Sequence, residues 1–237
     1  MKNNLFLILL MLLIPCSVFA KSNEDTPLFK KNYIQIDPGY LDYETVNASN
    51  TRYNENNLQF ITSRPSILFH FNVDDFIFTP FISIDPTVKT SQGSFAAGKL
   101  FDDDFEVGLY TLINHTETDQ GVGSNENAII ATQFLLGPYL AVYPYANQDS
   151  YFEIYARVAY QYSTLKYITN GAHDDVSDQL GLNLNFGLQY STKLSDKIYF
   201  APNVNFTYFA TSDYGGQNTT RNGYELQIMP ISFQMAL

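Results

Sequence analysis

The feature that most constrains this chain is a strict two-residue alternation near its C-terminal end. Across residues 180–190 every even position is Leu, Phe or Tyr, and every odd position is Gly, Asn or Gln. Successive side chains of a β-strand point to opposite faces, so this pattern predicts one long strand with an apolar and a polar face. Residues 199–208 and 229–237 repeat the alternation, and a tight turn at 195–196 separates the first two segments.

Seven further segments have strand character, which brings the predicted total to ten. They are 33–43, 57–71, 76–88, 92–101, 105–115, 128–144 and 150–164. The segment 92–101 has the weakest pattern. Eight strands, with 89–127 as one long outer excursion, are therefore the alternative.

The connections between these strands indicate the architecture. Short turns, as at 72–75, 102–104 and 146–149, alternate along the chain with connections rich in Asn, Asp, Gly, Ser and Thr. The predicted long connections are 44–56, 116–127, 165–179 and 211–222. A meander with short turns at one rim and long loops at the other is typical of an outer-membrane β-barrel, whose short turns face the periplasm. The predicted fold is an all-β, closed antiparallel up-and-down transmembrane barrel.

The polar faces distinguish a membrane barrel from a soluble one. Charged residues make up only 16% of the chain, and the polar faces consist of Gly, Asn, Gln, Ser and Thr. A soluble barrel exposes its polar face to bulk water and normally carries Lys, Glu and Arg there, whereas neutral residues fit a confined lumen. Most segments also have the length of about 9–11 residues that a membrane-crossing strand needs. A secreted soluble β-barrel that binds an apolar ligand is the alternative.

Residues 1–20 have the composition of a secretory signal peptide. Lys2 is followed by an apolar run from Leu5 to Ile14 and by a small-residue end at Ala20. The run is shorter than the roughly 18–20 residues that a spanning helix requires. Cleavage near Ala20 predicts export to the cell outer membrane of a Gram-negative envelope. Residues 21–32 then form an N-terminal periplasmic segment, and 33–237 form the barrel.

The net charge argues against nucleic acid as a partner, and the cysteine content argues against a disulfide. Thirteen Lys and Arg against 24 Asp and Glu give a net charge of −11, which is the wrong sign for a nucleic-acid surface. The single cysteine, Cys16, lies inside the predicted signal peptide, so the mature chain has no disulfide. We expect outer-membrane lipid and the barrel-assembly machinery as partners, a monomeric state, and no cofactor.

Aromatic residues gather where an interfacial belt would place them. They are Tyr139, Tyr143, Tyr145, Tyr151, Phe152, Tyr160, Tyr162, Tyr208 and Phe209. The alternative for these residues is ordinary packing of a soluble β core.

Three stretches carry a resemblance to a known family. They are Gly98-Lys-Leu-Phe-Asp-Asp-Asp-Phe-Glu-Val-Gly-Leu-Tyr, Phe134-Leu-Leu-Gly-Pro-Tyr-Leu-Ala-Val-Tyr and Leu182-Asn-Leu-Asn-Phe-Gly-Leu-Gln-Tyr-Ser-Thr-Lys-Leu-Ser-Asp-Lys. Residues 98–210 thereby resemble the small bacterial outer-membrane β-barrel ("porin family") proteins. The resemblance implies fold and location and carries no chemistry. The family usually ends in Phe or Trp, which the assembly machinery reads, whereas this chain ends in Leu237.

Some outer-membrane barrels are enzymes, so catalytic groups need testing. A nucleophilic site requires a hydroxyl or thiol within hydrogen-bond reach of a histidine. The nearest approach is His115 with Glu117, which has no serine beside it, and His70 is expected to make a hydrogen bond in the lumen. The acidic stretches 119–125 and 173–178 offer oxygen ligands, but neither has EF-hand spacing. We therefore predict no catalytic residue, no cofactor-binding residue and no metal site.

Charged residues on the inward phase are the candidate functional residues. They are Arg64, Asp85, Glu106, Glu153 and Arg157. Charges of both signs inside a narrow barrel are expected to pair and to plug it. The sequence thus predicts a non-enzymatic outer-membrane barrel that serves envelope structure, surface contact or weak small-solute passage, with a lipid-modifying enzyme as a further alternative.

Overall fold

The computed structural model describes residues 26–48, 54–61, 65–85, 89–102, 104–119, 127–169, 172–213 and 220–237. The predicted signal peptide and its cleavage site lie outside these residues. Among the described residues, no helix has the length and hydropathy needed to cross a membrane.

The described chain is almost entirely β-sheet. A single 3₁₀ turn, η2 (Leu28–Lys30), precedes the strands. The strands are β1 (Tyr33–Asp37), β2 (Tyr40–Ala48), β3 (Asn54–Ile61), β4 (Ser66–Val73), β5 (Phe76–Asp85), β6 (Thr90–Phe101), β7 (Phe105–Asp119), β8 (Asn127–Ala146), β9 (Ser150–Thr169), β10 (Ala172–Lys193), β11 (Ile198–Phe200), β12 (Asn203–Asp213), β13 (Thr220–Met229) and β14 (Phe233–Ala236).

These segments make ten barrel strands, because four of the strands are interrupted once. The pairs β1 and β2, β3 and β4, β11 and β12, and β13 and β14 each continue one strand. A proline lies in each interruption, at Pro38, Pro65, Pro202 and Pro230. Proline has no N–H to donate to the ladder, which weakens pairing at these points. Since β6 is a regular strand, the alternative of eight strands is wrong.

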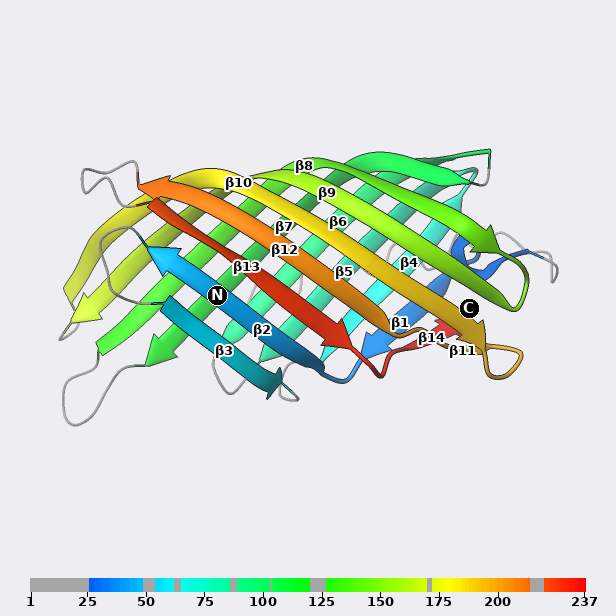
Figure 1. Cartoon of the computed structure of the whole chain (residues 1–237), viewed down its shortest axis with the longest axis horizontal. Helices are drawn as coiled ribbons and strands as arrows, with labels where there is room; N and C mark the ends of the chain where they lie inside the picture. Colours follow the sequence, from blue (N-terminus) through cyan, green and yellow to red (C-terminus); the bar gives the residue numbers. More distant parts are fainter. Residues whose placement is uncertain are drawn as a thin grey trace.

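Pairing between the two ends of the chain closes the barrel. The antiparallel ladder runs from β4 through β10 to β13, and β1 pairs with both β4 and β14. β2 pairs with β13 and with β3, so the first strand joins the last one on one side and the second on the other. Figure 1 shows the strands crossing obliquely to the long axis of the molecule. The predicted closed up-and-down barrel is confirmed.

The two rims differ less than expected. At the rim that carries the C-terminus, residues 74–75, 147–149 and 194–197 form turns, and Asp102 and Asp104 lie in a fourth turn. We call this rim the short-turn end. Asp74 and Asp75 both have positive φ, as a two-residue hairpin turn requires. At the opposite end, the predicted long loop 165–179 is wrong, because β9 and β10 pair up to Thr169 and Ala172. The predicted loop 44–56 is also shorter than expected, because β2 and β3 pair up to Asn47 and Asn54.

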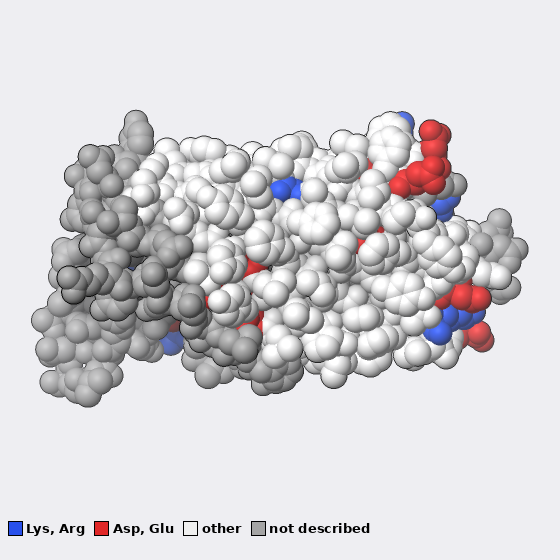
Figure 2. Space-filling view, viewed as in Figure 1, with Lys and Arg blue, Asp and Glu red and all other residues white. Residues whose placement is uncertain are grey.

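The faces of the strands follow the alternation. On β10, Leu182, Leu184 and Phe186 are exposed on the outside, whereas Asn183 and Gln189 are buried. In Figure 2 the middle of the molecule is almost free of charged side chains, and those at the short-turn end cluster near the rim. An apolar belt outside and polar residues inside are the reverse of a soluble barrel with an apolar cavity. The alternative of a secreted soluble barrel is therefore wrong.

Candidate functional site: the barrel lumen

A buried apolar cluster, which we call the plug, lies inside the barrel at the short-turn end. The turn η2 packs Leu28 and Phe29 into the barrel, where each is 1% exposed. The Phe29 ring stacks on Tyr143 with 4.0 Å between ring centroids, and its carbonyl oxygen lies 2.7 Å from Nε2 of His70. Tyr33, Ile77, Leu100, Ala141, Tyr151 and Tyr199 complete the buried cluster. The segment 21–32, which the sequence places in the periplasm, thus contributes side chains to the interior.

A buried polar network lies beside this plug, where the first and last strands meet. Nε2 of Gln234 donates to Oε1 of Gln35 at 2.9 Å and to the Tyr151 hydroxyl at 2.8 Å. Its Oε1 accepts from the Ser191 hydroxyl at 2.7 Å, and Nε2 of Gln189 donates to Tyr151 at 2.8 Å. The side chains come from β14, β1, β9 and β10. The network therefore joins the closing seam of the barrel to the nearby strands β10 and β9.

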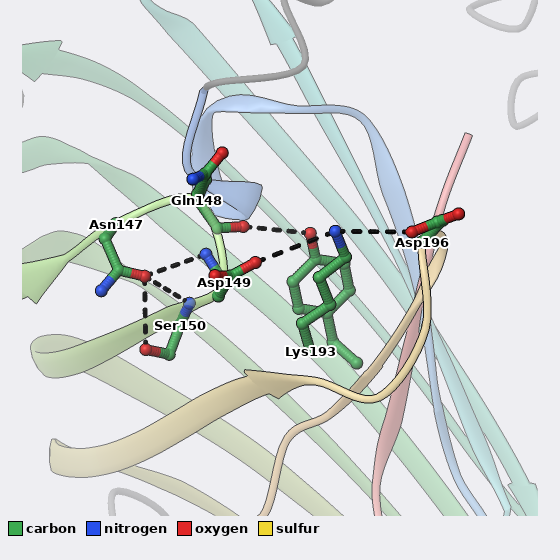
Figure 3. A network of polar contacts seen from close by, with 7 residues as sticks. Asn147, Gln148, Asp149, Ser150, Lys193 and Asp196 are labelled. Atoms are coloured by element: carbon green, nitrogen blue, oxygen red, sulfur yellow. Dashed lines mark hydrogen bonds and ion pairs between the residues drawn. The ribbon is translucent and has the colours of Figure 1, made fainter.

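The neighbouring turns are tied together at the rim itself. Oδ1 of Asn147 accepts the backbone N–H groups of Asp149 and Ser150 at 2.9 and 2.8 Å. Nζ of Lys193 lies 3.8 Å from Asp149 and 3.7 Å from Asp196, so it bridges two turns, as Figure 3 shows. These exposed ion pairs each contribute little to stability. They add to the contacts that join neighbouring turns at the short-turn end.

Above the plug, Glu106 is held by two tyrosines. The hydroxyls of Tyr139 and Tyr143 donate to its two carboxylate oxygens, the second at 3.0 Å. Tyr139 can reach Glu106 because it lies across two glycines of the adjacent strands. A Cβ on Gly108 would come 2.5 Å from the Tyr139 ring, and one on Gly98 would overlap its hydroxyl. The inward glycines of β6 and β7 thus make room for an aromatic side chain from β8.

Arg157 lies in the lumen between aromatic rings. Its Cζ is 4.4 Å from the ring centroids of both Tyr110 and Tyr155. Such cation–π contacts stabilise a guanidinium that is removed from water. Among the described residues Arg157 forms no ion pair, and its buried Nε has no hydrogen-bond partner. Glu106 and Glu153 lie near enough to interact electrostatically with Arg157, so the expected pairing of lumen charges stays a prediction beside these ring contacts.

A polar cavity of about 860 Å³ occupies the lumen. Within the described part of the chain, seven carboxylates and one arginine line it. The carboxylates are Asp37, Asp42, Glu44, Asp85, Glu106, Glu153 and Glu225. Glu44 and Glu225 stand directly opposite each other on β2 and β13. The remaining wall is mostly Asn, Gln, Ser and Thr, so the interior has an excess of acidic groups.

The structure places four of the five predicted lumen charges in this cavity. Asp85 and Glu106 are buried, and Glu153 and Arg157 line the wall on β9. Arg64 lies outside the described residues. Sequence reasoning missed four acidic positions, Asp37, Asp42, Glu44 and Glu225. Asp42 and Glu44 alternate with Leu41 and Tyr43, so the two-residue period could have identified them.

Part of the predicted aromatic belt faces the lumen instead. Tyr139, Tyr143 and Tyr151 are buried, and Phe209 lines the cavity. Tyr145, Tyr160, Tyr162 and Tyr208 are exposed on the outside, as a belt requires. Tyr145 points the other way from Tyr143 because the ladder shifts register between Val142 and Tyr145.

The described histidines have structural contacts. His70 stacks on Tyr33 with 4.4 Å between centroids and contacts the Phe29 carbonyl. Nδ1 of His115 lies 3.0 Å from the Thr132 hydroxyl, whereas Glu117 is bound to Lys89 at 2.9 Å. In the part of the chain described here, no group of three His, Cys, Asp or Glu side chains is arranged to hold a metal ion.

Comparisons with known proteins find fold similarity alone. No protein-family profile matches the chain, and no curated protein matches its sequence. Three solved structures illustrate the similarity. The Neisserial surface protein A shares 9% identity at a TM-score of 0.36, over 87% of this chain and 97% of that one. The outer membrane protein OprG from Pseudomonas aeruginosa shares 13% at 0.34, over 91% and 100%. The outer membrane protease OmpT from Escherichia coli shares 8% at 0.43, over 92% and 99%.

These structures include a protease, so fold similarity does not choose a function. The exposed apolar belt, the polar lumen and the ring of ten paired strands come from this structure itself. The chain is a closed antiparallel transmembrane β-barrel of the outer-membrane type.

Proposed function

We propose that the chain is a non-enzymatic outer-membrane barrel whose lumen is closed toward the periplasm, and that it serves envelope structure or surface contact. The observation that carries this proposal is the burial of Leu28 and Phe29 in the short-turn end of the barrel. In outer-membrane barrels this end faces the periplasm. A solute that entered the cavity from outside would meet an apolar cluster in place of an exit.

The mature chain would then lie in the outer membrane after removal of its first twenty residues, as a monomer in contact with lipid.

The side chains inside the barrel further support closure of the lumen. Glu106 is fixed by two tyrosines, and Arg157 lies between two more, so both charges are held in place by neighbouring rings. Weak solute passage then requires displacement of the plug.

Conductance in planar lipid bilayers tests this function. Purified mature protein should show no steady channel, and the double substitution Leu28→Ala with Phe29→Ala should produce one. Phe76→Ala is the matched control, because Phe76 is an exposed aromatic residue at the same end of the barrel. Large, stable channels from the unaltered protein would contradict the proposal and indicate a porin.

A lipid-modifying enzyme is the second candidate, and it depends on the contact between His115 and Thr132. A hydroxyl beside an imidazole is the minimal arrangement for an activated nucleophile. The carboxylate that could orient the histidine, Glu117, is instead bound to Lys89. Turnover of phospholipid or lipid A by the refolded protein, abolished by His115→Ala, would replace the non-enzymatic proposal with this one.

A further inference from the structure

Three buried polar atoms without a protein partner lie on one wall of the lumen cavity. They are Nε of Arg157, Oδ1 of Asn185 and Nδ2 of Asn203. All three side chains line the cavity. Proteins leave few buried polar atoms unpaired, and each such group in a native structure needs an explanation.

The three side chains belong to one continuous patch on β9, β10 and β12. Arg157 is the cross-strand neighbour of Asn185, and Nδ2 of Asn185 donates to the Thr207 hydroxyl at 2.8 Å. Tyr155, whose ring contacts Arg157, donates a hydrogen bond from its hydroxyl to Oδ1 of Asn205. Nδ2 of Asn205 in turn lies 3.5 Å from Oδ1 of Asn203. The patch is thus held in place by its own bonds.

The three atoms that lack a hydrogen bond are two donors and one acceptor. Nε of Arg157 and Nδ2 of Asn203 donate, and Oδ1 of Asn185 accepts. A hydroxyl group can satisfy either kind of atom, whereas a carboxylate only accepts and an ammonium only donates. The mixed set therefore favours a ligand with several hydroxyl groups.

The charge of the cavity points to the same class. Seven carboxylates and one arginine line the described wall, so a small anion is repelled by the lumen as a whole. A cation would find carboxylates elsewhere in the cavity but is repelled by Arg157 at the patch. An uncharged ligand avoids both costs. The cavity of about 860 Å³ lies in the range of small-molecule sites.

We propose that this patch, formed by Arg157, Asn185 and Asn203 with their neighbours, is a binding site for an uncharged polyol of the saccharide class. Aromatic rings beside amide groups offer such a ligand both an apolar surface and hydrogen bonds. The site requires no exit toward the periplasm, and it is independent of whether the lumen conducts.

Isothermal titration calorimetry tests the site with the mature protein in a detergent whose head group is not a sugar. The probes are glucose and sucrose, with gluconate as the anionic and glucosamine as the cationic comparison. Asn185→Ala and Asn203→Ala should each weaken sugar binding about tenfold, the effect of losing one or two hydrogen bonds. Gln133→Ala is the matched control, since Gln133 lines the cavity on β8. Gel mobility before and after heating establishes whether each variant is folded. If an Ala variant does not fold, Asn185→Ser or Asn203→Ser is used in its place.

The outcomes separate the ligand classes. Sugar binding that is weakened in the two Asn variants and retained in the Gln133 variant supports the site. Tighter binding of gluconate or glucosamine than of glucose overturns the uncharged class. An absence of heat with both sugars, or equal weakening in all three variants, overturns the site itself. None of these results depends on the conductance of the barrel.

Discussion

The substitution Gln234→Leu tests whether the buried network at the seam holds the barrel closed. Gln234 lies on β14, is 0% exposed, and bonds to side chains from three other strands. Leucine has a similar volume and no polar atom. The substitution therefore removes three hydrogen bonds while it changes the packing little.

The cost follows from the partners that lose their bonds. In the variant, the Ser191 hydroxyl and Oε1 of Gln35 stay buried but lose the hydrogen bond that Gln234 provided. Tyr151 keeps its hydrogen bond from Gln189. Each buried group without a partner lowers the free energy of unfolding by about 1–3 kcal/mol, and burial of the apolar leucine side chain offsets part of this loss. We expect the free energy of unfolding to fall by about 2–4 kcal/mol. Adding Ser191→Ala should lower the total cost relative to the sum of the two single changes, because the unpaired hydroxyl is removed.

Urea unfolding of the refolded protein in lipid vesicles measures this quantity. The chain has no tryptophan, so far-ultraviolet circular dichroism and gel mobility report the folded fraction. Gln133→Leu provides the control for a glutamine of the cavity wall on β8. A Gln234→Leu protein within about 0.5 kcal/mol of the unaltered protein would refute the reasoning, since surface substitutions reach that size.

Two further pairs of substitutions test the faces of the barrel wall and the close approach of its strands. Leu184→Arg places a charge on the outer face in the middle of β10 and should cost about 2–4 kcal/mol in urea unfolding, while Gln133→Arg in the acidic lumen should cost much less; equal costs would contradict the orientation. Gly108→Ala would bring a Cβ 2.2 Å from a backbone carbonyl oxygen of the adjacent strand and should cost about 1–3 kcal/mol. Gly93→Ala, whose nearest atom is 3.8 Å away, should be nearly neutral in the same measurement.

The strands could be predicted from the sequence because each of them separates lipid from lumen. A residue that faces lipid must be apolar, so residues 180–190 show their period directly. That requirement ends beyond the membrane. Residues 172–179 are mostly polar and show no two-residue alternation, so the sequence predicts a loop where β9 and β10 form a tall hairpin.

The lumen was less predictable, because its contacts depend on register and on local irregularity. The shift between Val142 and Tyr145 reverses the phase of β8, so the tyrosines on either side face opposite ways. The plug comes from a turn of three residues, Leu28–Lys30, which is too short to show any period. The surroundings of Arg157 follow from rings on β7 and β9 that only the folded barrel brings together.

Site-directed spin labelling tests the central claim, that the apolar face of each strand meets lipid and the polar face lines a closed lumen. The only cysteine lies in the predicted signal peptide, so single cysteines can be placed one at a time along residues 182–187 of the mature chain. Labels at 182, 184 and 186 should collide freely with oxygen dissolved in the bilayer, and labels at 183, 185 and 187 should not. A reversed pattern, or oxygen access without a period of two, would contradict the barrel described here.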